Sequence, residues 1–178
     1  HLDAEKTFDV SADLQELAQT PVTVISAGPK AILDLPKTLQ VLETLGVPVV
    51  TFGQDELPAF WSRSSGLRSP IRMNSAEEIA RSQLIREALS IPGGQLVANP
   101  IPAYAEIPFQ EILPIIKKAH LEANKENISD KNLTPFLLEK VFNLTDGASL
   151  NANIELVKNN ASLACKVASS LITEKSRL

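Results

Sequence analysis

The clearest folding signal in the chain lies in residues 22–52, which read VTVISAGPKAILDLPKTLQVLETLGVPVVTF. A β-branched run ends at a Gly-Pro pair, leucines then recur at nearly helical spacing, and a second β-branched run follows. We therefore predict a strand over residues 22–26, a helix over 32–45 and a strand over 47–52. The two strands of such a βαβ unit are parallel.

The alternation of helix and strand continues downstream. Ser75 precedes an amphipathic helix with acidic residues in its first turn, and residues 95–98 form another short apolar strand. Beyond these, the pattern predicts three helices, over residues 108–123, 134–144 and 149–173. The sequence thus indicates an α/β fold: a layered sheet with βαβ units flanked by helices, and a helical C-terminal region. We interpret residues 1–178 as a single α/β domain.

Composition excludes several classes of protein. The chain has 178 residues, 17 basic and 21 acidic side chains and a net charge of -4, which argues against a nucleic-acid-binding surface. It has no apolar run of 18 residues, so we expect no membrane span, and residues 1–7 lack the apolar stretch of a secretory signal. Cys165 is the only cysteine, which rules out an intrachain disulfide and a cysteine metal cluster.

Residues 7–14 alternate strictly between polar and apolar side chains, which is typical of a strand with one buried face. Asp9, Ser11 and Asp13 would then share the polar face. Two carboxylates and a hydroxyl suit a hard, oxygen-seeking cation or the hydroxyls of a sugar. The same pattern is also typical of the solvated outer face of an edge strand.

Lys30 is the strongest candidate nucleophile by position. It follows a predicted strand and a Gly-Pro turn, at the predicted start of a helix, where open α/β sheets bind their ligands. The positive end of a helix dipole favours an uncharged amine, which could form a Schiff base. A solvated surface lysine is the alternative.

Two further segments have more than one interpretation. Asn153, Asn159 and Asn160 lie in the last predicted helix, where a buried carboxamide could pair with the edge of a heterocycle, although most helical Asn residues are exposed. Residues 58–63 include Phe60 and Trp61, which could anchor an interface.

Seven short segments, in this order, are characteristic of one known family: DVSADLQEL (9–17), KAILD (30–34), LETLGVP (42–48), LPAF (57–60), ANPIP (98–102), TPFLL (134–138) and NIELVKNN (153–160). Together they resemble the pseudouridine-5'-phosphate glycosidase family, also called indigoidine synthase A-like. The resemblance spans nearly the whole chain. It implies a reversible cleavage of pseudouridine 5'-phosphate, with water, into uracil and ribose 5-phosphate.

The resemblance also implies roles for particular residues. Lys30 matches the nucleophile that forms a Schiff base, and Asp9 matches the ligand of a divalent metal, usually Mn²⁺. The segment Ser11, Ala12 and Asp13 matches the part of the family that contacts the substrate, and Asn153 falls where the family places an amide near the base. Family members are α/β proteins that assemble as trimers, so we expect a homotrimer.

The match is to the C-terminal part of family members. Their general-acid glutamate and phosphate-contacting lysine belong to an N-terminal part that the present sequence lacks, so that part is an expected partner. A second hypothesis is therefore a non-catalytic phosphosugar-binding or assembly module. A third is a Schiff-base sugar-phosphate aldolase, which would share Lys30 but would not need base recognition at Asn153.

The sequence ends in Ser176-Arg177-Leu178, which is similar to the Ser-Lys-Leu peroxisomal address. The resulting expectation is a peroxisomal protein. The alternative is a cytoplasmic protein whose last helix frays at this tripeptide.

Overall fold

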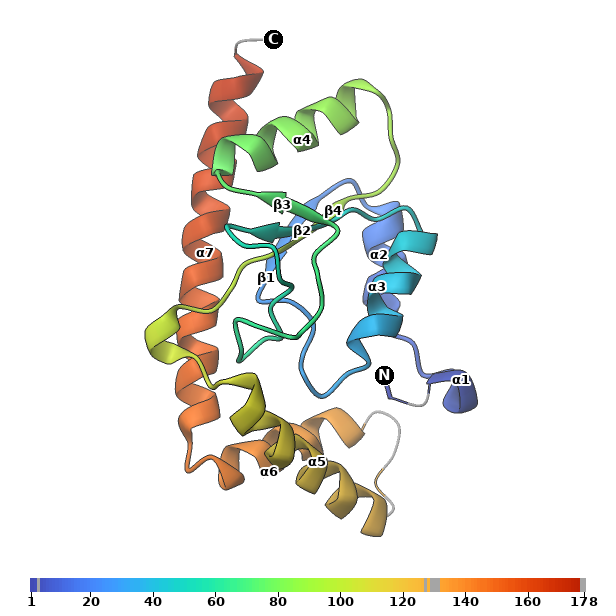
Figure 1. The fold of residues 1–178 in the computed structure, drawn as a ribbon. Helices are drawn as coiled ribbons and strands as arrows, with labels where there is room; N and C mark the ends of the chain where they lie inside the picture. Colours follow the sequence, from blue (N-terminus) through green and yellow to red (C-terminus); the bar gives the residue numbers. More distant parts are fainter. Residues whose placement is uncertain (3, 127, 129–131, 177–178) are drawn as a thin grey trace.

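A four-stranded parallel sheet forms the centre of the computed structural model, which describes residues 1–2, 4–126, 128 and 132–176 (Figure 1). The strands lie in the order β1 (Thr23–Ser26), β4 (Gln95–Ala98), β2 (Val49–Phe52) and β3 (Ile71–Met73). Every neighbouring pair is parallel. This confirms the α/β class, the predicted βαβ unit and the predicted strand over residues 95–98. β3 has no clear sequence signal, because it is three residues long and two of them are exposed.

Helices cover both faces of this sheet (Figure 1). On one face, α4 (Ala76–Ala88) and α7 (Ala148–Lys175) pack against Val50 and Val97. On the other face, α2 (Ala12–Gln19) and α3 (Leu35–Thr44) pack against strand residues that include Val49 and Leu96. Burial on both faces explains why the strands are almost continuously apolar in sequence.

The other helices gather beyond the carboxyl ends of β1 and β4. They are α5 (Phe109–Lys125), α6 (Leu133–Leu144) and the single turn η1 (Ala103–Ala105), while α1 (Ala4–Thr7) lies near the start of the chain. α5 and α6 pack side by side next to the start of α7 (Figure 1). The three predicted C-terminal helices are therefore confirmed.

The predicted strand over residues 7–14 is wrong. Ser11 caps α2, and its Oγ accepts a hydrogen bond from the Asp13 backbone N–H at 3.2 Å. Leu14 and Leu17 then pack against the sheet with helical spacing, which outweighs an alternation that does not continue beyond Leu14. Asp13 is consequently a residue of the first helical turn, and it does not share a strand face with Asp9.

α3 begins later than the sequence predicts. The Asp34 carboxylate caps it, accepting a hydrogen bond from the Lys37 backbone N–H at 3.1 Å, and Leu35 is its first residue. The placement of Lys30 at a helix start is therefore wrong, because Lys30 lies in a turn four residues before the cap. An aspartate is a better N-cap than the residues around Lys30, which explains the shift.

Trp61 is a core residue. It is 2% exposed, and its indole N–H donates a hydrogen bond to the Ser149 carbonyl at 3.2 Å. The predicted interface anchor over residues 58–63 is therefore wrong for this side chain. No helix within the described residues combines the length and apolarity that crossing a membrane requires.

The start of α2 can be tested with proline. Ala12 is the first helical residue and Ser11 has φ -61° and ψ 133°, which a following proline tolerates. We expect Ala12→Pro to change the free energy of unfolding by less than about 0.5 kcal/mol, whereas Glu16→Pro, within the same helix, lowers it by about 3 kcal/mol. Urea unfolding measures both. Equal destabilisation by the two prolines would contradict the helical assignment.

Candidate functional site

A cavity of about 390 Å³ lies between α2, α3 and β1, on the face of the sheet opposite α7. Its walls are largely aliphatic, and its polar groups come from α2 and its caps, from α3, from the end of β1 and from residue 1. The lining residues are His1, Ser11, Asp13, Leu14, Glu16, Leu17, Thr20, Val22, Val24, Ser26, Gly28, Pro29, Leu33, Thr38, Leu42 and Leu96. Hydroxyl and carboxylate groups beside an apolar wall suit a polyhydroxyl ligand that also carries a flat, less polar group.

The turn after β1 closes one side of this cavity. The Ser26 Oγ accepts a hydrogen bond from the Gly28 backbone N–H at 3.2 Å, and the Ala27 carbonyl accepts one from the Phe60 backbone N–H at 3.0 Å. Gly28 has a φ of +84°, and a Cβ there would lie 2.2 Å from the Pro58 carbonyl oxygen. Only glycine tolerates both the positive φ and the close approach of the Pro58 carbonyl, so the turn is fixed by a close backbone contact.

Lys30 leaves this turn directly after Pro29, which lines the cavity. The Lys30 residue is half-buried, and its carbonyl accepts a hydrogen bond from the Leu33 backbone N–H at 2.9 Å. Lys30 is therefore next in the chain to a residue that lines the same cavity as Ser11 and Asp13, but Lys30 itself is not one of the lining residues. Ala12 is exposed and does not line the cavity.

Asp9 lies between α1 and α2, in a tight turn in which the Val10 backbone N–H donates a hydrogen bond to the Phe8 carbonyl at 3.0 Å. Its Oδ1 is 2.9 Å from the His1 Nδ1, a contact that nothing in the sequence spacing indicates. No set of three or more His, Cys, Asp or Glu side chains converges as a metal site in the part of the chain that the structure describes. The chemistry of Asp9 still fits a hard cation held through one carboxylate and completed by water or ligand oxygens.

Asn153 and Lys30 belong to the same end of the sheet. Ala31, next to Lys30, shares one hydrophobic cluster with Ala152 and Leu156, which flank Asn153 on α7. Asn153 itself is half-buried on α7, which covers the face of the sheet opposite the cavity, and it does not line the cavity.

The neighbouring carboxamides hold the fold together. The Asn160 Oδ1 accepts a hydrogen bond from the Asn99 Nδ2 at 3.1 Å, and the Asn159 Nδ2 donates one to the Pro100 carbonyl at 3.0 Å. These contacts attach α7 to the segment that follows β4. The interpretation of Asn159 and Asn160 as base-pairing groups is therefore not supported, since their amides already bind the chain itself.

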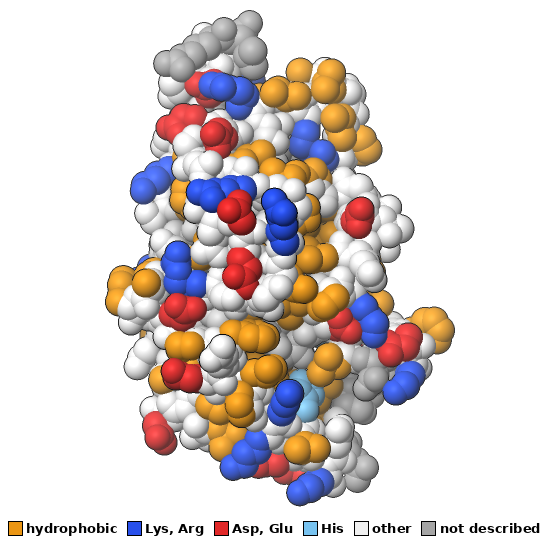
Figure 2. All heavy atoms as spheres, in the orientation of Figure 1, with side chains coloured by type: hydrophobic (Ala, Val, Ile, Leu, Met, Phe, Trp, Pro, Cys, Tyr) orange, Lys and Arg blue, Asp and Glu red, His pale blue; other side chains and the backbone are white. Residues whose placement is uncertain are grey.

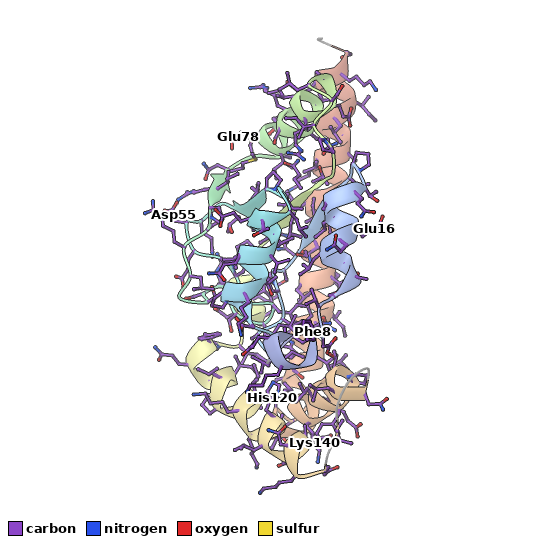
Figure 3. The ribbon with its side chains drawn as sticks, turned by 90° about the vertical axis from the view of Figure 1, so that its right-hand side faces the viewer. Phe8, Glu16, Asp55, Glu78, His120 and Lys140 are labelled. Atoms are coloured by element: carbon purple, nitrogen blue, oxygen red, sulfur yellow. The ribbon has the colours of Figure 1, made fainter. Side chains whose placement is uncertain are left out.

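His120 lies on α5 (Figure 3). It lines a second cavity of about 430 Å³ together with Ala31, Leu33 and Asp34. Burial lowers the pKa of the imidazole, and a hydrogen bond with the Ile32 backbone opposes that shift. In the sequence, His120 follows the buried Ile116 by four residues and so lies beside the apolar stripe of α5. This spacing is the signal that indicates its partial burial.

The surface around these elements mixes both signs of charge. In Figure 2, acidic and basic side chains are interspersed, and a band of hydrophobic side chains runs down the middle of the face. Figure 3 shows Glu16 on the outer side of α2 and Phe8 beside α1. Phe8 is 87% exposed.

This chain belongs to the indigoidine synthase A-like family, whose model matches residues 1–170. It is 60% identical over 173 residues to a pseudouridine-5'-phosphate glycosidase of Paracoccus denitrificans, covering 97% of this chain and 57% of that protein. It is 62% identical over 173 residues to the protein of the same name from a Jannaschia species, with the same coverage. The chain therefore spans little more than half the length of these relatives.

Two solved structures have the same architecture. A prealnumycin C-glycosynthase, determined in complex with ribulose 5-phosphate, superposes with a TM-score of 0.93 at 28% identity, covering 100% of this chain and 59% of that one. An indigoidine synthase A-like protein from Thermotoga maritima gives a TM-score of 0.81 at 37% identity, covering 90% of this chain and 53% of that one.

Gly28→Ala tests the close contact that fixes the turn. We expect it to lower the free energy of unfolding by more than about 3 kcal/mol, because both the backbone angle and the Pro58 carbonyl oppose a Cβ. Gly46→Ala is the matched control: its φ is +72° but nothing lies within 4 Å of the added Cβ, so about 1 kcal/mol is expected. Thermal or urea unfolding gives both values, and equal losses would show that the contact is unimportant.

The half-buried imidazole of His120 predicts a pH dependence of stability. Because its pKa is lower in the folded chain, the unfolded chain binds more protons, and stability is lost as the pH falls below about 6.5. A tenfold difference in proton affinity corresponds to about 1.4 kcal/mol.

The free energy of unfolding of the parent, relative to His120→Leu, should therefore decrease between about pH 7.5 and pH 5. Denaturant titrations at several pH values measure this difference. A constant difference across that range would contradict the predicted burial effect.

Proposed function

We propose that this chain forms part of a pseudouridine-5'-phosphate glycosidase, an enzyme that cleaves a carbon-carbon glycosidic bond and releases uracil and ribose 5-phosphate. The observation that carries the proposal is the shared cavity, in which Ser11 and Asp13 lie beside the Gly28-Pro29 turn that leads to Lys30. The names of its relatives at 60% and 62% identity support the same activity.

The chemistry of a C-glycoside explains why an amine is needed. The ribose is joined to uracil through carbon, so protonation of a glycosidic oxygen or nitrogen cannot create a leaving group. In the proposed reaction, the Lys30 Nζ bonds to the sugar carbon that carries uracil as the sugar ring opens, and the ring oxygen gains a proton. Protonation of the uracil carbon then breaks the carbon-carbon bond while nitrogen and the sugar carbon form an imine. Water hydrolyses that imine, which restores the amine and frees ribose 5-phosphate.

Ser11 and Asp13 have the role of binding the sugar in this proposal. The Ser11 hydroxyl can donate or accept a hydrogen bond, and the Asp13 carboxylate can accept hydrogen bonds from the hydroxyls of an open pentose that lies in the cavity. Ala12 would contribute its backbone, because a methyl side chain offers no hydrogen bond. Asn153 would face the base, since its carboxamide matches the alternating donor and acceptor edge of uracil.

Asp9 is the proposed ligand of a divalent cation, the hard ion Mn²⁺ that the family resemblance implies. A bound cation would supply positive charge to the phosphosugar oxygens. The contact between Asp9 and His1 supports this assignment only in showing that the carboxylate accepts a positively charged or hydrogen-bonding neighbour.

The chain spans 57% of its relatives, so the complete site would need more than these residues. We propose that the N-terminal part of the longer family members contributes the general acid and the phosphate contact, and that the complete enzyme is a homotrimer. The same shortfall in length favours one alternative, a phosphosugar-binding or assembly module without turnover.

The peroxisomal address remains a prediction. Arg177 and Leu178 lie outside the described residues. The alternative, that the protein is cytoplasmic, also remains a prediction.

Reductive trapping tests Lys30 directly. Incubation of the chain with ribose 5-phosphate and borohydride should convert an imine into a stable secondary amine on Lys30, which peptide mass spectrometry locates. Lys30→Arg should abolish the adduct, because arginine keeps the charge but forms no imine. Lys37 is the internal control, since its ammonium is ion-paired with Glu5 at 2.6 Å and with Asp34 at 3.1 Å.

An activity assay distinguishes the glycosidase from the binding module without turnover. The chain is assayed with pseudouridine 5'-phosphate and Mn²⁺ in two forms, alone and joined to the additional segment of the Paracoccus relative. Uracil release by the joined protein, lost in Lys30→Arg, supports the glycosidase. Adduct formation without uracil release from either form would leave a phosphosugar-binding module. Labelling of Lys37 in place of Lys30 would contradict both the nucleophile and the site.

A further inference from the structure

Residues 58–63, which we call the 58–63 loop, contact both the turn after β1 and the segment that follows β4. On the side of the turn, the Pro58 carbonyl makes the close contact with Gly28. The Phe60 backbone N–H donates its hydrogen bond to the Ala27 carbonyl at 3.0 Å. Phe60 has a φ of +61°, a left-handed conformation that is unfavourable for a residue with a Cβ. Contacts elsewhere must therefore hold the loop in this shape.

Arg63 makes the principal contacts on the other side of the loop. Its Nη1 donates a hydrogen bond to the carbonyl of the fully buried Ile101 at 2.7 Å. Its backbone N–H donates one to the Glu106 Oε1, also at 2.7 Å. The neighbouring Ser62 Oγ donates a third to the Ile107 carbonyl at 2.6 Å. Hydrogen bonds with one charged partner are roughly twice as strong as neutral ones, so the two contacts of Arg63 are the stronger attachments.

Gln54 fixes the orientation of the half-buried Arg63 side chain. The Gln54 Nε2 donates a hydrogen bond to the Arg63 carbonyl at 2.6 Å, and the Gln54 Oε1 accepts one from the Arg63 Nη2 at 3.3 Å. The guanidinium therefore bonds to two separate oxygens, one of a backbone carbonyl and one of a side-chain amide. A planar guanidinium suits two such acceptors, whereas the compact ammonium of a lysine does not hold both in one geometry.

The segment that Arg63 bonds to is itself held in place. The carboxamide contacts of Asn99 with Asn160, and of Asn159 with Pro100, attach it to α7. A connected set of hydrogen bonds thus runs from α7, through the segment after β4 and the 58–63 loop, to the turn after β1. Arg63 joins the last two parts of this set.

We propose that Arg63 is a positioning residue for Lys30. By attaching the 58–63 loop to the segment after β4, it holds the Pro58 carbonyl and the Phe60 N–H against the turn from which Lys30 continues. Arg63 is not among the residues that line the cavity of about 390 Å³, so it acts through the backbone and not on the substrate. The inference rests on the proposed role of Lys30 as the nucleophile.

Arg63→Met tests this role, because it removes the guanidinium and keeps an unbranched side chain. In reductive trapping with ribose 5-phosphate, we expect the limiting rate of adduct formation at Lys30 to fall by about tenfold, because a small misplacement of a reacting group is costly. The half-saturating concentration of ribose 5-phosphate should stay as in the parent, since Ser11 and Asp13 remain in place. Circular dichroism checks that the variant is folded.

Arg72→Met is the matched control. Arg72 is an exposed arginine outside the 58–63 loop, and its guanidinium contacts Asp55 at 3.2 Å and Asn74 at 2.8 Å. The same substitution there should leave the limiting rate unchanged. Arg63→Lys should give an intermediate rate, because an ammonium can keep only part of the attachment.

Amide hydrogen exchange tests the inference without imine chemistry. The Phe60 and Leu33 N–H groups report on the turn, because they donate to the Ala27 and Lys30 carbonyls at 3.0 and 2.9 Å. In Arg63→Met both should exchange several-fold faster than in the parent, while the amides of β4 keep the rate of the parent. Unchanged exchange of these two amides would overturn the inference, as would an unchanged limiting rate of trapping.

The two measurements also separate this inference from the proposed function. A parent chain that forms no adduct at Lys30 would contradict the proposed nucleophile. The exchange rates then decide by themselves whether Arg63 holds the turn: faster exchange in Arg63→Met, but not in Arg72→Met, supports the positioning role, and equal exchange in the two variants overturns it.

Discussion

The arrangement of the candidate site depends on one backbone contact, between Gly28 and the Pro58 carbonyl. A Cβ at residue 28 would lie 2.2 Å from that oxygen, so the two loops can approach this closely only at a glycine. The contact holds the turn after β1 against the loop that follows β2. Because Pro29 and Lys30 come next in the chain, the position of the candidate nucleophile depends on this contact.

Helix capping and core packing position the other part of the site, which is the α2 segment that lines the cavity. The Ser11 hydroxyl caps α2, and Leu14 and Leu17 attach that helix to the sheet, which brings Asp13 to the cavity. On the other face of the sheet, α7 is attached through carboxamide contacts to the segment after β4. The polar groups that line the cavity are therefore placed by residues whose own roles are structural.

Much of the fold could be predicted because its signals are local. The β-branched runs around β1 and β2, the Ser75 cap of α4 and the helical periodicity of α7 each appear within a short window of sequence. The strand predicted over residues 7–14 is wrong because a short helix with no fully buried residue gives a weak helical period, and a chance alternation is as strong. Other features come from tertiary contacts that no local pattern predicts. Asp9 contacts His1, and the Trp61 indole N–H donates a hydrogen bond to the Ser149 carbonyl, 88 residues away in sequence.

We propose that the turn after β1 directs the Lys30 amine into the cavity lined by Ser11 and Asp13. A crystal structure of the borohydride-reduced adduct with ribose 5-phosphate tests it most directly. We expect the reduced sugar chain to enter the cavity, with its hydroxyls within hydrogen-bond distance of the Ser11 Oγ and the Asp13 carboxylate. A sugar chain that extends from Lys30 into solvent, away from α2, would contradict it.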